Sequence, residues 1–330
     1  MTIIKKAIMG CAMVLLSTPV LAEVRLSHHF PPTHPSAIAI DEFVADVATR
    51  TNGALTIEVF PAGQLMSARD VMGGIASGSV QMGVTVGLVS FPAMNSDYAV
   101  AAVPGLFDSY DALRGFFADT PEGQRIWSSL TTDLGMLAVA DIPSGPAAVY
   151  STREDLSSAN SFEGTSARVL SAADRPRWEA LGTERMVSVP TGEVYTALQS
   201  GMIDTLSSVP GAINSNSWWD FLKSVQLPYF IFADGHVLAN NTWFNSLPTD
   251  QQQAIRDAGA AMGTKATDSI MRVADEQVAQ FVDHGGKAFT LEGEALGELR
   301  GIEADKVWPE MAKMLGSGVL DAAVAYTKAR

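Results

Sequence analysis

A helical pattern near the C-terminus limits what this chain can fold into more than any other feature. Across residues 249–281 the apolar residues recur every three or four positions, the spacing of one buried helix face. A helix of about 33 residues is about 50 Å long, which exceeds the width of one small domain. Such a helix would run across two lobes and brace them. The apolar positions are Ile255, Ala258, Met262, Ala266, Ile270, Val273, Val278 and Phe281.

The ends of this pattern carry helix start and stop signals. Thr249 and Gln252 have the spacing of a capping box, and Gly285-Gly286 follows the last apolar residue. Two interior glycines, Gly259 and Gly263, each cost a helix about 1 kcal/mol. A second interpretation therefore stays open, in which two shorter helices meet near these glycines.

The remaining patterns predict an α/β fold in two lobes. The chain without its first 22 residues has 308 of the 330 residues, more than the ~250–300 at which single cores stop growing. No linker separates the halves, so we expect several crossings, the first at Pro143-Ser144-Gly145-Pro146. The predicted lobes are residues 23–143 plus about 234–270, and 144–233 plus about 271–330. Strands are expected at 24–27, 55–60, 82–86, 136–140, near 168 and at 225–232, and further helices at 36–51, 69–77, 111–134, 174–181 and 192–200.

The first 22 residues have the order of a secretory signal peptide. Lys5 and Lys6 precede an apolar run over 7–16, and Val20-Leu21-Ala22 resembles a cleavage site. Ten apolar residues are too few to cross a bilayer, which needs about 20. We expect cleavage after Ala22 and a periplasmic location. The alternatives are an N-terminal core helix and lipidation of Cys11.

The composition excludes several classes of function. Cys11 is the only cysteine, so the processed chain has no disulfide, thiol nucleophile or cysteine metal site. Without Lys5 and Lys6, 20 basic residues face 36 acidic ones, a net charge of −16. Nucleic-acid binding requires clustered basic residues, so such a surface repels nucleic acid. No catalytic or cofactor motif is present, and we expect no cofactor. His28, His29 and His34 could form a metal site, but we favour loop packing for them, because a site needs converging ligands.

Several motifs resemble one family, the TRAP transporter solute-binding proteins, or DctP family. The resemblance covers roughly residues 23–300 and implies a two-lobed periplasmic binding protein whose lobes, joined by crossing strands and a long helix, enclose a ligand cleft. It implies a monomeric receptor that delivers a small organic acid to a small and a large membrane subunit driven by an ion gradient. The matching segments are His28 with His34-Pro35, Phe60-Pro61-Ala62-Gly63-Gln64-Leu65 with Arg69, Pro104-Gly105-Leu106-Phe107 with Tyr110, and Pro190-Thr191-Gly192-Glu193-Val194-Tyr195-Thr196-Ala197-Leu198-Gln199-Ser200-Gly201-Met202-Ile203-Asp204.

The resemblance also assigns Arg168 to the ligand. In Gly164-Thr165-Ser166-Ala167-Arg168-Val169 it matches a family arginine that commonly pairs with a ligand carboxylate. A planar guanidinium binds a carboxylate through two parallel hydrogen bonds. Ala147 stands near where many members carry a second arginine, and Thr191 where Phe is frequent. These departures favour a monocarboxylate over a dicarboxylate.

Six other residues complete the predicted ligand site: His29, Phe30, Gly87, Thr191, Ser207 and Ser208. Phe30 follows the first strand at an expected cleft edge. Four further aromatic residues are expected to serve the core instead, namely Trp218, Trp219, Tyr229 and Phe230. Two other functions remain as alternatives. One is a receptor for an ATP-driven importer or a sensor, and the other is a secreted enzyme acting on a small acid.

Overall fold

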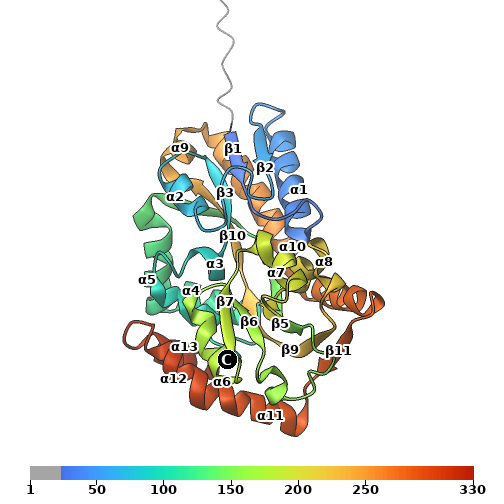
Figure 1. Cartoon of the computed structure of the whole chain (residues 1–330). Helices are drawn as coiled ribbons and strands as arrows, with labels where there is room; N and C mark the ends of the chain where they lie inside the picture. Colours follow the sequence, from blue (N-terminus) through green and yellow to red (C-terminus); the bar gives the residue numbers. More distant parts are fainter. Residues whose placement is uncertain (1–23) are drawn as a thin grey trace, which may run out of the picture.

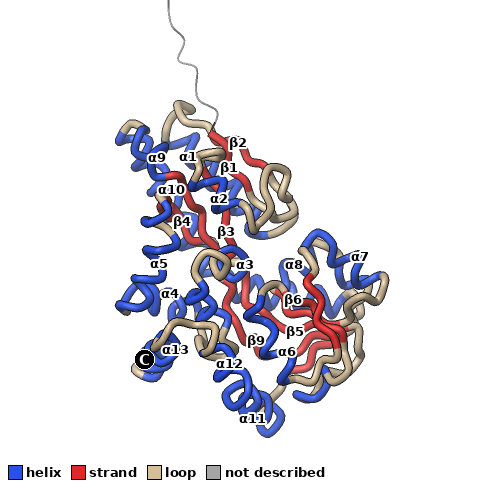
Figure 2. Tube along the Cα trace, turned by 60° about the vertical axis from the view of Figure 1, so that its left-hand side comes forward, coloured by secondary structure: helices blue, strands red, loops and turns tan. Residues whose placement is uncertain are grey.

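Two β-sheets, one in each lobe, organise the computed structural model, which describes residues 24–330 (Figure 1). The predicted cleavage site and Cys11 lie outside these residues. Lobe I contains the sheet β2-β1-β3-β10-β4, and lobe II contains the sheet β11-β9-β5-β8-β6-β7. The turned view of Figure 2 separates the two sets of strands. The strands are β1 (Val24–Ser27), β2 (Ile57–Phe60), β3 (Met82–Val86), β4 (Met136–Asp141), β5 (Gly145–Ser151), β6 (Ser166–Val169), β7 (Arg185–Ser188), β8 (Thr205–Ser208), β9 (Ser224–Ala233), β10 (Gly235–Asn240) and β11 (Lys287–Thr290).

Helices flank both sheets, and the expected two-lobed α/β fold is confirmed. Most of the predicted strands and helices lie within a few residues of their observed positions. The helices are α1 (Pro35–Arg50), α2 (Val71–Ala76), α3 (Gly87–Ser90), α4 (Tyr110–Asp119), α5 (Pro121–Leu130), α6 (Arg175–Ala180), α7 (Val194–Gln199), α8 (Pro210–Ser215), α9 (Asn241–Ser246), α10 (Thr249–Asp283), α11 (Gly293–Ile302), α12 (Trp308–Ala312) and α13 (Val319–Lys328).

Two local predictions were wrong, and the structure gives the reasons. The helix expected at 111–134 is divided, because Thr120 caps a new helix through the N–H of Gly123 and Pro121 occupies its first turn. Proline lacks the N–H that would continue the preceding helix. The capping box of α10 does not form either. Pro248 holds the cap position, and the Gln252 amide donates to the Leu247 carbonyl at 2.9 Å.

The helix α10 is continuous through both of its interior glycines. It runs for 35 residues, so the interpretation as two helices is wrong. Gly259 lies against β4, where an added Cβ atom would stand 2.0 Å from the Val139 carbonyl oxygen. A Cβ atom added at Gly263 would lie 3.3 Å from the Asp141 carbonyl oxygen. The glycines therefore let the helix backbone rest on the strand, and this close packing offsets their helix cost.

Two chain segments cross between the lobes side by side. Residues 142–144 join β4 to β5, and Asp234 joins β9 to β10. The Ile142 N–H donates to the Gly235 carbonyl at 2.8 Å, and the Ser144 N–H donates to the Ala233 carbonyl at 2.9 Å. We call these two hydrogen-bonded segments the hinge.

The C-terminal segment passes from lobe II back to lobe I. Leu299 of α11 packs in a core cluster of lobe II with Trp178. The following Val307 and Val319 instead pack with Phe116 of α4 in lobe I. The predicted lobe bounds placed residues 271–330 together in lobe II, and these bounds stay a prediction.

A buried ionic network joins the hinge to lobe I. Nδ1 of His236 lies 2.9 Å from Asp141, and Nε2 lies 2.9 Å from Asp234, which also accepts from the Tyr98 hydroxyl. Burial alone would lower the pKa of His236, but the hydrogen bonds and charges of the two aspartates outweigh it and raise this pKa to about 9. His236 is therefore a buried cation between two carboxylates at neutral pH.

We predict that Gly259→Ala destabilises the protein by about 1–3 kcal/mol, because its methyl group must push α10 away from β4. Gly297→Ala in α11 is the matched control, since nothing lies within 4 Å of its added Cβ atom. The control should be neutral or gain about 0.5–1 kcal/mol. Urea unfolding measures both. Equal effects of the two substitutions would contradict the packing role of Gly259.

We also predict that stability falls as pH rises from about 6.5 to about 9. The pKa of His236 is raised from 6.5 to about 9, so its stabilisation is complete below pH 6.5 and lost through pH 9. His236→Gln should be less stable than wild type at pH 6.5 and should lose this dependence. Unfolding free energies from pH 6 to 9.5 test the prediction. A variant whose pH profile parallels that of wild type would count against it.

Candidate functional site

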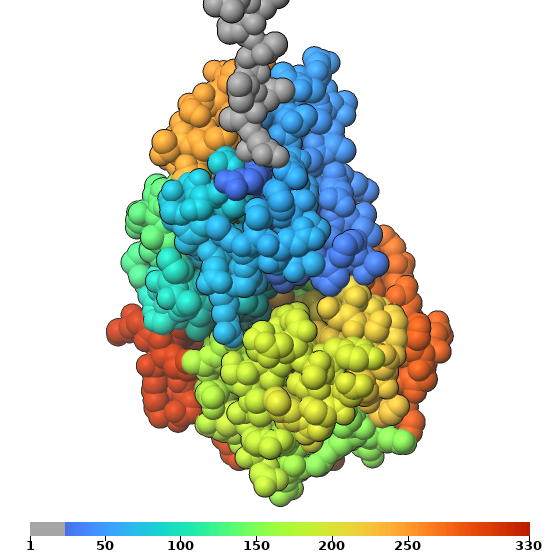
Figure 3. Space-filling view, turned by 45° about the horizontal axis from the view of Figure 1, so that its top comes forward, coloured from blue at the N-terminus to red at the C-terminus, as the bar shows by residue number. Residues whose placement is uncertain are grey.

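In both sheets, strands that carry predicted site residues have their carboxyl ends next to the hinge. In lobe I, β3 ends at Val86 opposite Gly235, which follows the hinge residue Asp234. In lobe II, β8 ends at Ser208 opposite Ala148, close to where β5 begins. Ligands of open α/β sheets bind outside the carboxyl ends of the strands. Figure 3 shows the blue lobe I surface meeting the yellow-green lobe II surface along a seam.

Arg168 is fixed at this edge of lobe II. It lies on β6 with 4% of its surface exposed. Its Nε donates to the Val189 carbonyl at 2.9 Å, and its Nη2 donates to the Thr191 hydroxyl at 3.1 Å. The guanidinium carbon lies 5.8 Å from the ring centre of Trp218. These contacts hold the planar group in one orientation and leave Nη1 without a hydrogen-bond partner in the described part of the chain.

The charge of Arg168 is buried without an ion pair. Burial lowers the pKa of Arg168 to about 10, an effect that the nearby Asp174 carboxylate opposes and Arg69 reinforces. The guanidinium stays protonated at neutral pH. No carboxylate within the described residues 24–330 forms a salt bridge with it. A buried cation without an anionic partner is costly, so this position favours an anionic ligand.

Thr191 and Ser208 lie on the same side of the lobe II sheet as Arg168. Thr191 begins a short 3₁₀ helix, η5 (Thr191–Glu193), and contacts Arg168 directly. Ala167 of β6 pairs with Thr205 of β8, and side chains alternate along a strand. Ser208 therefore shares the sheet face of Arg168, whereas Ser207 points to the other face. Of the two serines, Ser208 is the better placed for a common ligand.

The lobe I residues of the predicted site lie at the carboxyl ends of β1 and β3. Phe30 is 4% exposed in the lobe I core and stacks on His34 at 4.5 Å. Burial lowers the pKa of His29 to about 4, so His29 is neutral, and its Nδ1 has no described hydrogen-bond partner. The Gly87 N–H donates to the Asp234 carbonyl at 3.1 Å. Among described residues, no hydrogen bond or ring contact joins these three to Arg168.

One contact between the lobes was not predicted as such. Arg69, at the end of the Phe60 motif, donates from Nη2 to the Leu170 carbonyl at 3.1 Å. Leu170 follows β6 by one residue, so this hydrogen bond links lobe I to the segment that carries Arg168. The motif had singled out Arg69, but a partner 101 residues away leaves no local sequence signal.

The four aromatic residues expected in the core have different surroundings. Trp218 is 1% exposed and lies beside Arg168. Trp219 stacks on His284 at 4.1 Å, and the Tyr229 hydroxyl donates to Asp275 at 3.0 Å. Phe230 is buried, and the guanidinium carbon of Arg177 lies 3.8 Å from the centre of the Phe230 ring. Trp218 is thus the one whose ring contacts Arg168.

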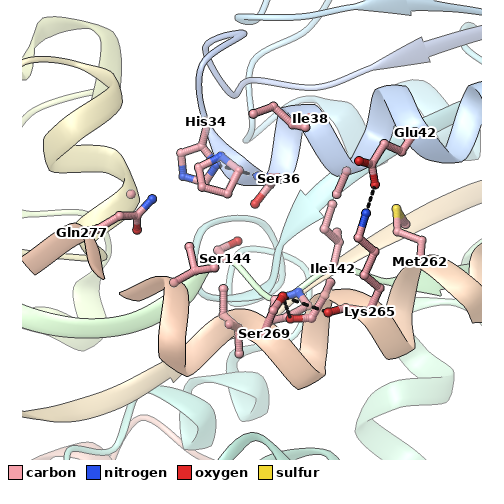
Figure 4. Close-up of a pocket in the computed structure, with 17 residues that line it drawn as sticks. His34, Ser36, Ile38, Glu42, Ile142, Ser144, Met262, Lys265, Ser269 and Gln277 are labelled. Atoms are coloured by element: carbon pink, nitrogen blue, oxygen red, sulfur yellow. Dashed lines mark hydrogen bonds and ion pairs between the residues drawn. The ribbon is translucent and has the colours of Figure 1, made fainter. Parts of the chain in front are cut away.

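A cavity of about 320 Å³ lies between the lobes at the hinge, and we call it the hinge cavity (Figure 4). Its walls come from α1, α8, α10 and residues 142–144. None of the seven predicted site residues lines it, although His34 in its wall stacks on Phe30 of the predicted site. Within residues 24–330, no cluster of three His, Cys, Asp or Glu is arranged for a metal ion, and no helix has the length and hydrophobicity of a membrane span.

Residues 26–314 match the sequence model of DctP, the bacterial extracellular solute-binding proteins of family 7. The chain belongs to the DctP family. This family supplies the solute receptors of TRAP transporters, so the expected receptor class is confirmed, and neither an ATP-driven importer nor an enzyme is favoured.

Individual DctP-family relatives support the same assignment over most of the chain. The C4-dicarboxylate-binding periplasmic protein DctP of Rhodobacter capsulatus is 27% identical over 324 residues, covering 94% of each chain. The structure of DctP7, a Bordetella pertussis extracytoplasmic solute receptor binding pyroglutamic acid, has a TM-score of 0.82 at 22% identity, covering 92% of this chain and 99% of that one. A TRAP periplasmic solute binding protein from Shewanella oneidensis with bound succinate has a TM-score of 0.80 at 23% identity, covering 92% and 98%.

Proposed function

We propose that this receptor binds a small organic monocarboxylate whose carboxylate pairs with Arg168. The observation that carries the proposal is a buried guanidinium, oriented by Val189 and Thr191, with no carboxylate of the described chain paired to it. A ligand carboxylate would satisfy the free Nη1 and neutralise the charge. Charge-assisted hydrogen bonds of this kind are stronger than neutral ones.

A single anchoring cation favours a monocarboxylate over a dicarboxylate. Ala147 is buried near the place where many DctP-family members carry a second arginine. Arg69 is exposed, and its Nη2 already donates to the Leu170 carbonyl. Water therefore screens the charge of Arg69, and its side chain is held by a hydrogen bond between the lobes. The hydroxyls of Thr191 and Ser208 suit a ligand with further oxygen atoms.

The relatives supply probes for both classes of acid. Pyroglutamate is bound by the Bordetella pertussis receptor and is a monocarboxylate, whereas the Shewanella oneidensis protein holds the dicarboxylate succinate. Galactonate, bound by a sugar acid binding protein from Advenella mimigardefordensis, adds a hydroxylated monocarboxylate. A thermal-shift comparison of these acids selects the ligand for the variants below, because a ligand that binds only the folded state raises its stability.

We predict that Arg168→Ala weakens binding of the selected acid by about 30-fold or more. Truncating one partner of a buried charge pair costs about 2–5 kcal/mol, and about 1.4 kcal/mol corresponds to a factor of ten. Arg168→Lys should also bind poorly, because an ammonium group lacks the planar fork. Arg185→Ala is the matched control, since this arginine lies exposed on the neighbouring strand β7. Calorimetry measures the affinities.

Circular dichroism checks that the three variants are folded, and the acid recovered from the calorimeter should be chemically unchanged, as a receptor requires. Binding by folded Arg168→Ala within about threefold of wild type, a difference below about 0.7 kcal/mol, would remove Arg168 from the site. Stronger thermal stabilisation by succinate than by either monocarboxylate would refute the ligand class alone.

Export and assembly complete the proposal. The family is extracellular, and Lys5, Lys6 and the segment after them have the order of a cleaved signal peptide. We propose a periplasmic monomer that begins at Glu23 and delivers its acid to a small and a large TRAP membrane subunit. Native mass spectrometry of the exported protein should give the monomer mass of residues 23–330. A retained Met1 or a lipid on Cys11 would contradict the proposed cleavage before Glu23. A stable dimer would contradict the proposed monomer.

A further inference from the structure

The hinge cavity has mostly apolar walls built from both lobes. Ile38 and Ala39 of α1 form one side, and Met262, Ile270 and Val273 of α10 form another. Gly211 of α8 brings lobe II to its edge, where an added Cβ atom would lie 3.1 Å from His34 Nε2. A molecule in this space would contact both lobes and the hinge at once.

Two hydrogen-bonding groups face this space without a described partner. Ser144 is only 6% exposed, and its buried Oγ atom makes no hydrogen bond within the described residues. Nδ1 of His34 accepts the Ser36 N–H at 3.1 Å, so the proton of the neutral ring is on Nε2. Burial lowers the pKa of His34 to about 3, which keeps the ring neutral. Figure 4 shows both side chains at the cavity.

The charged groups of the hinge cavity stand at its rim and satisfy each other. Lys265 Nζ lies 2.5 Å from Glu42, and the two side chains are 70% and 54% exposed. No other charged residue lines the cavity in the described part of the chain. An ionised group would thus enter without a counter-ion and lose its hydration, which is costly. The cavity suits a neutral molecule, in contrast to the Arg168 site.

We propose that the hinge cavity is a second binding site, which takes a neutral, mainly apolar small molecule with one hydrogen-bond acceptor. The apolar body packs on α1 and α10, and a carbonyl or hydroxyl oxygen accepts from the Ser144 hydroxyl. A cavity of about 150 Å³ holds benzene, so about 320 Å³ accommodates a compact bicyclic molecule. Because the occupant contacts both lobes, it favours this arrangement of the lobes over any other.

Camphor, a rigid bicyclic ketone, is the probe. Calorimetry should detect camphor binding to the wild type. Ala266→Leu, which fills the cavity from α10, should weaken that binding at least tenfold. Ala261→Leu is the matched control, because Ala261 is exposed on the same helix and lines no part of the cavity. Ser144→Ala should weaken camphor about threefold to tenfold, since one hydrogen bond is lost.

The carboxylate derivative ketopinate separates this site from the Arg168 site. Ketopinate is camphor with a carboxylate in place of one methyl group. It should be excluded from the hinge cavity, so any ketopinate binding should be unchanged in Ala266→Leu. Circular dichroism checks that each variant is folded. If Ala266→Leu does not fold, the camphor affinity of Ser144→Ala tests the proposal instead. Absent camphor binding to the wild type, equal camphor affinity in wild type and Ser144→Ala, or loss of ketopinate binding in Ala266→Leu would each overturn the proposal.

Discussion

The contact between α10 and β4 sets the positions of most other elements. At Gly259 the helix backbone rests directly on a strand carbonyl of lobe I. The same rigid helix then passes the hinge and packs in lobe II, where Phe281 lies in the core and Asn214 of α8 donates to the Gln277 carbonyl at 3.1 Å. One continuous helix therefore fixes both lobes relative to the crossing strands. The hinge cavity is a space that this arrangement leaves between the lobes.

Three buried cations of the chain differ in what neutralises them. Arg177 lies 3.0 Å from the buried carboxylate of Glu303, and His236 lies between two aspartates. Both belong to networks that hold elements together. Arg168 has backbone and hydroxyl acceptors but no described carboxylate. An ion pair commonly offsets the desolvation cost of a buried charge, so Arg168 is the one of these three cations whose cost is not offset in this way within the described residues.

Sequence patterns predicted the elements whose periodicity is strong, and the motif singled out Arg168. They did not predict the division at Pro121 correctly, because the apolar spacing continues across the break. They also missed the hinge cavity and the His236 network. The cavity is lined by residues as far apart in the sequence as His34, Ser144 and Met262. The His236 network likewise joins Asp141 to Asp234. Such groupings depend on tertiary packing, which has no local sequence signature.

The strand order of lobe I has a consequence for the order of events during synthesis. β10 lies between β3 and β4, although about 150 residues separate it from β3, and within residues 24–330 β4 pairs with no other strand. The first 140 residues emerging from the ribosome thus lack the strand that joins their sheet. Non-local strand pairing is slow because a long loop must close first. The five-stranded sheet of lobe I consequently cannot be completed until about residue 240 has been made.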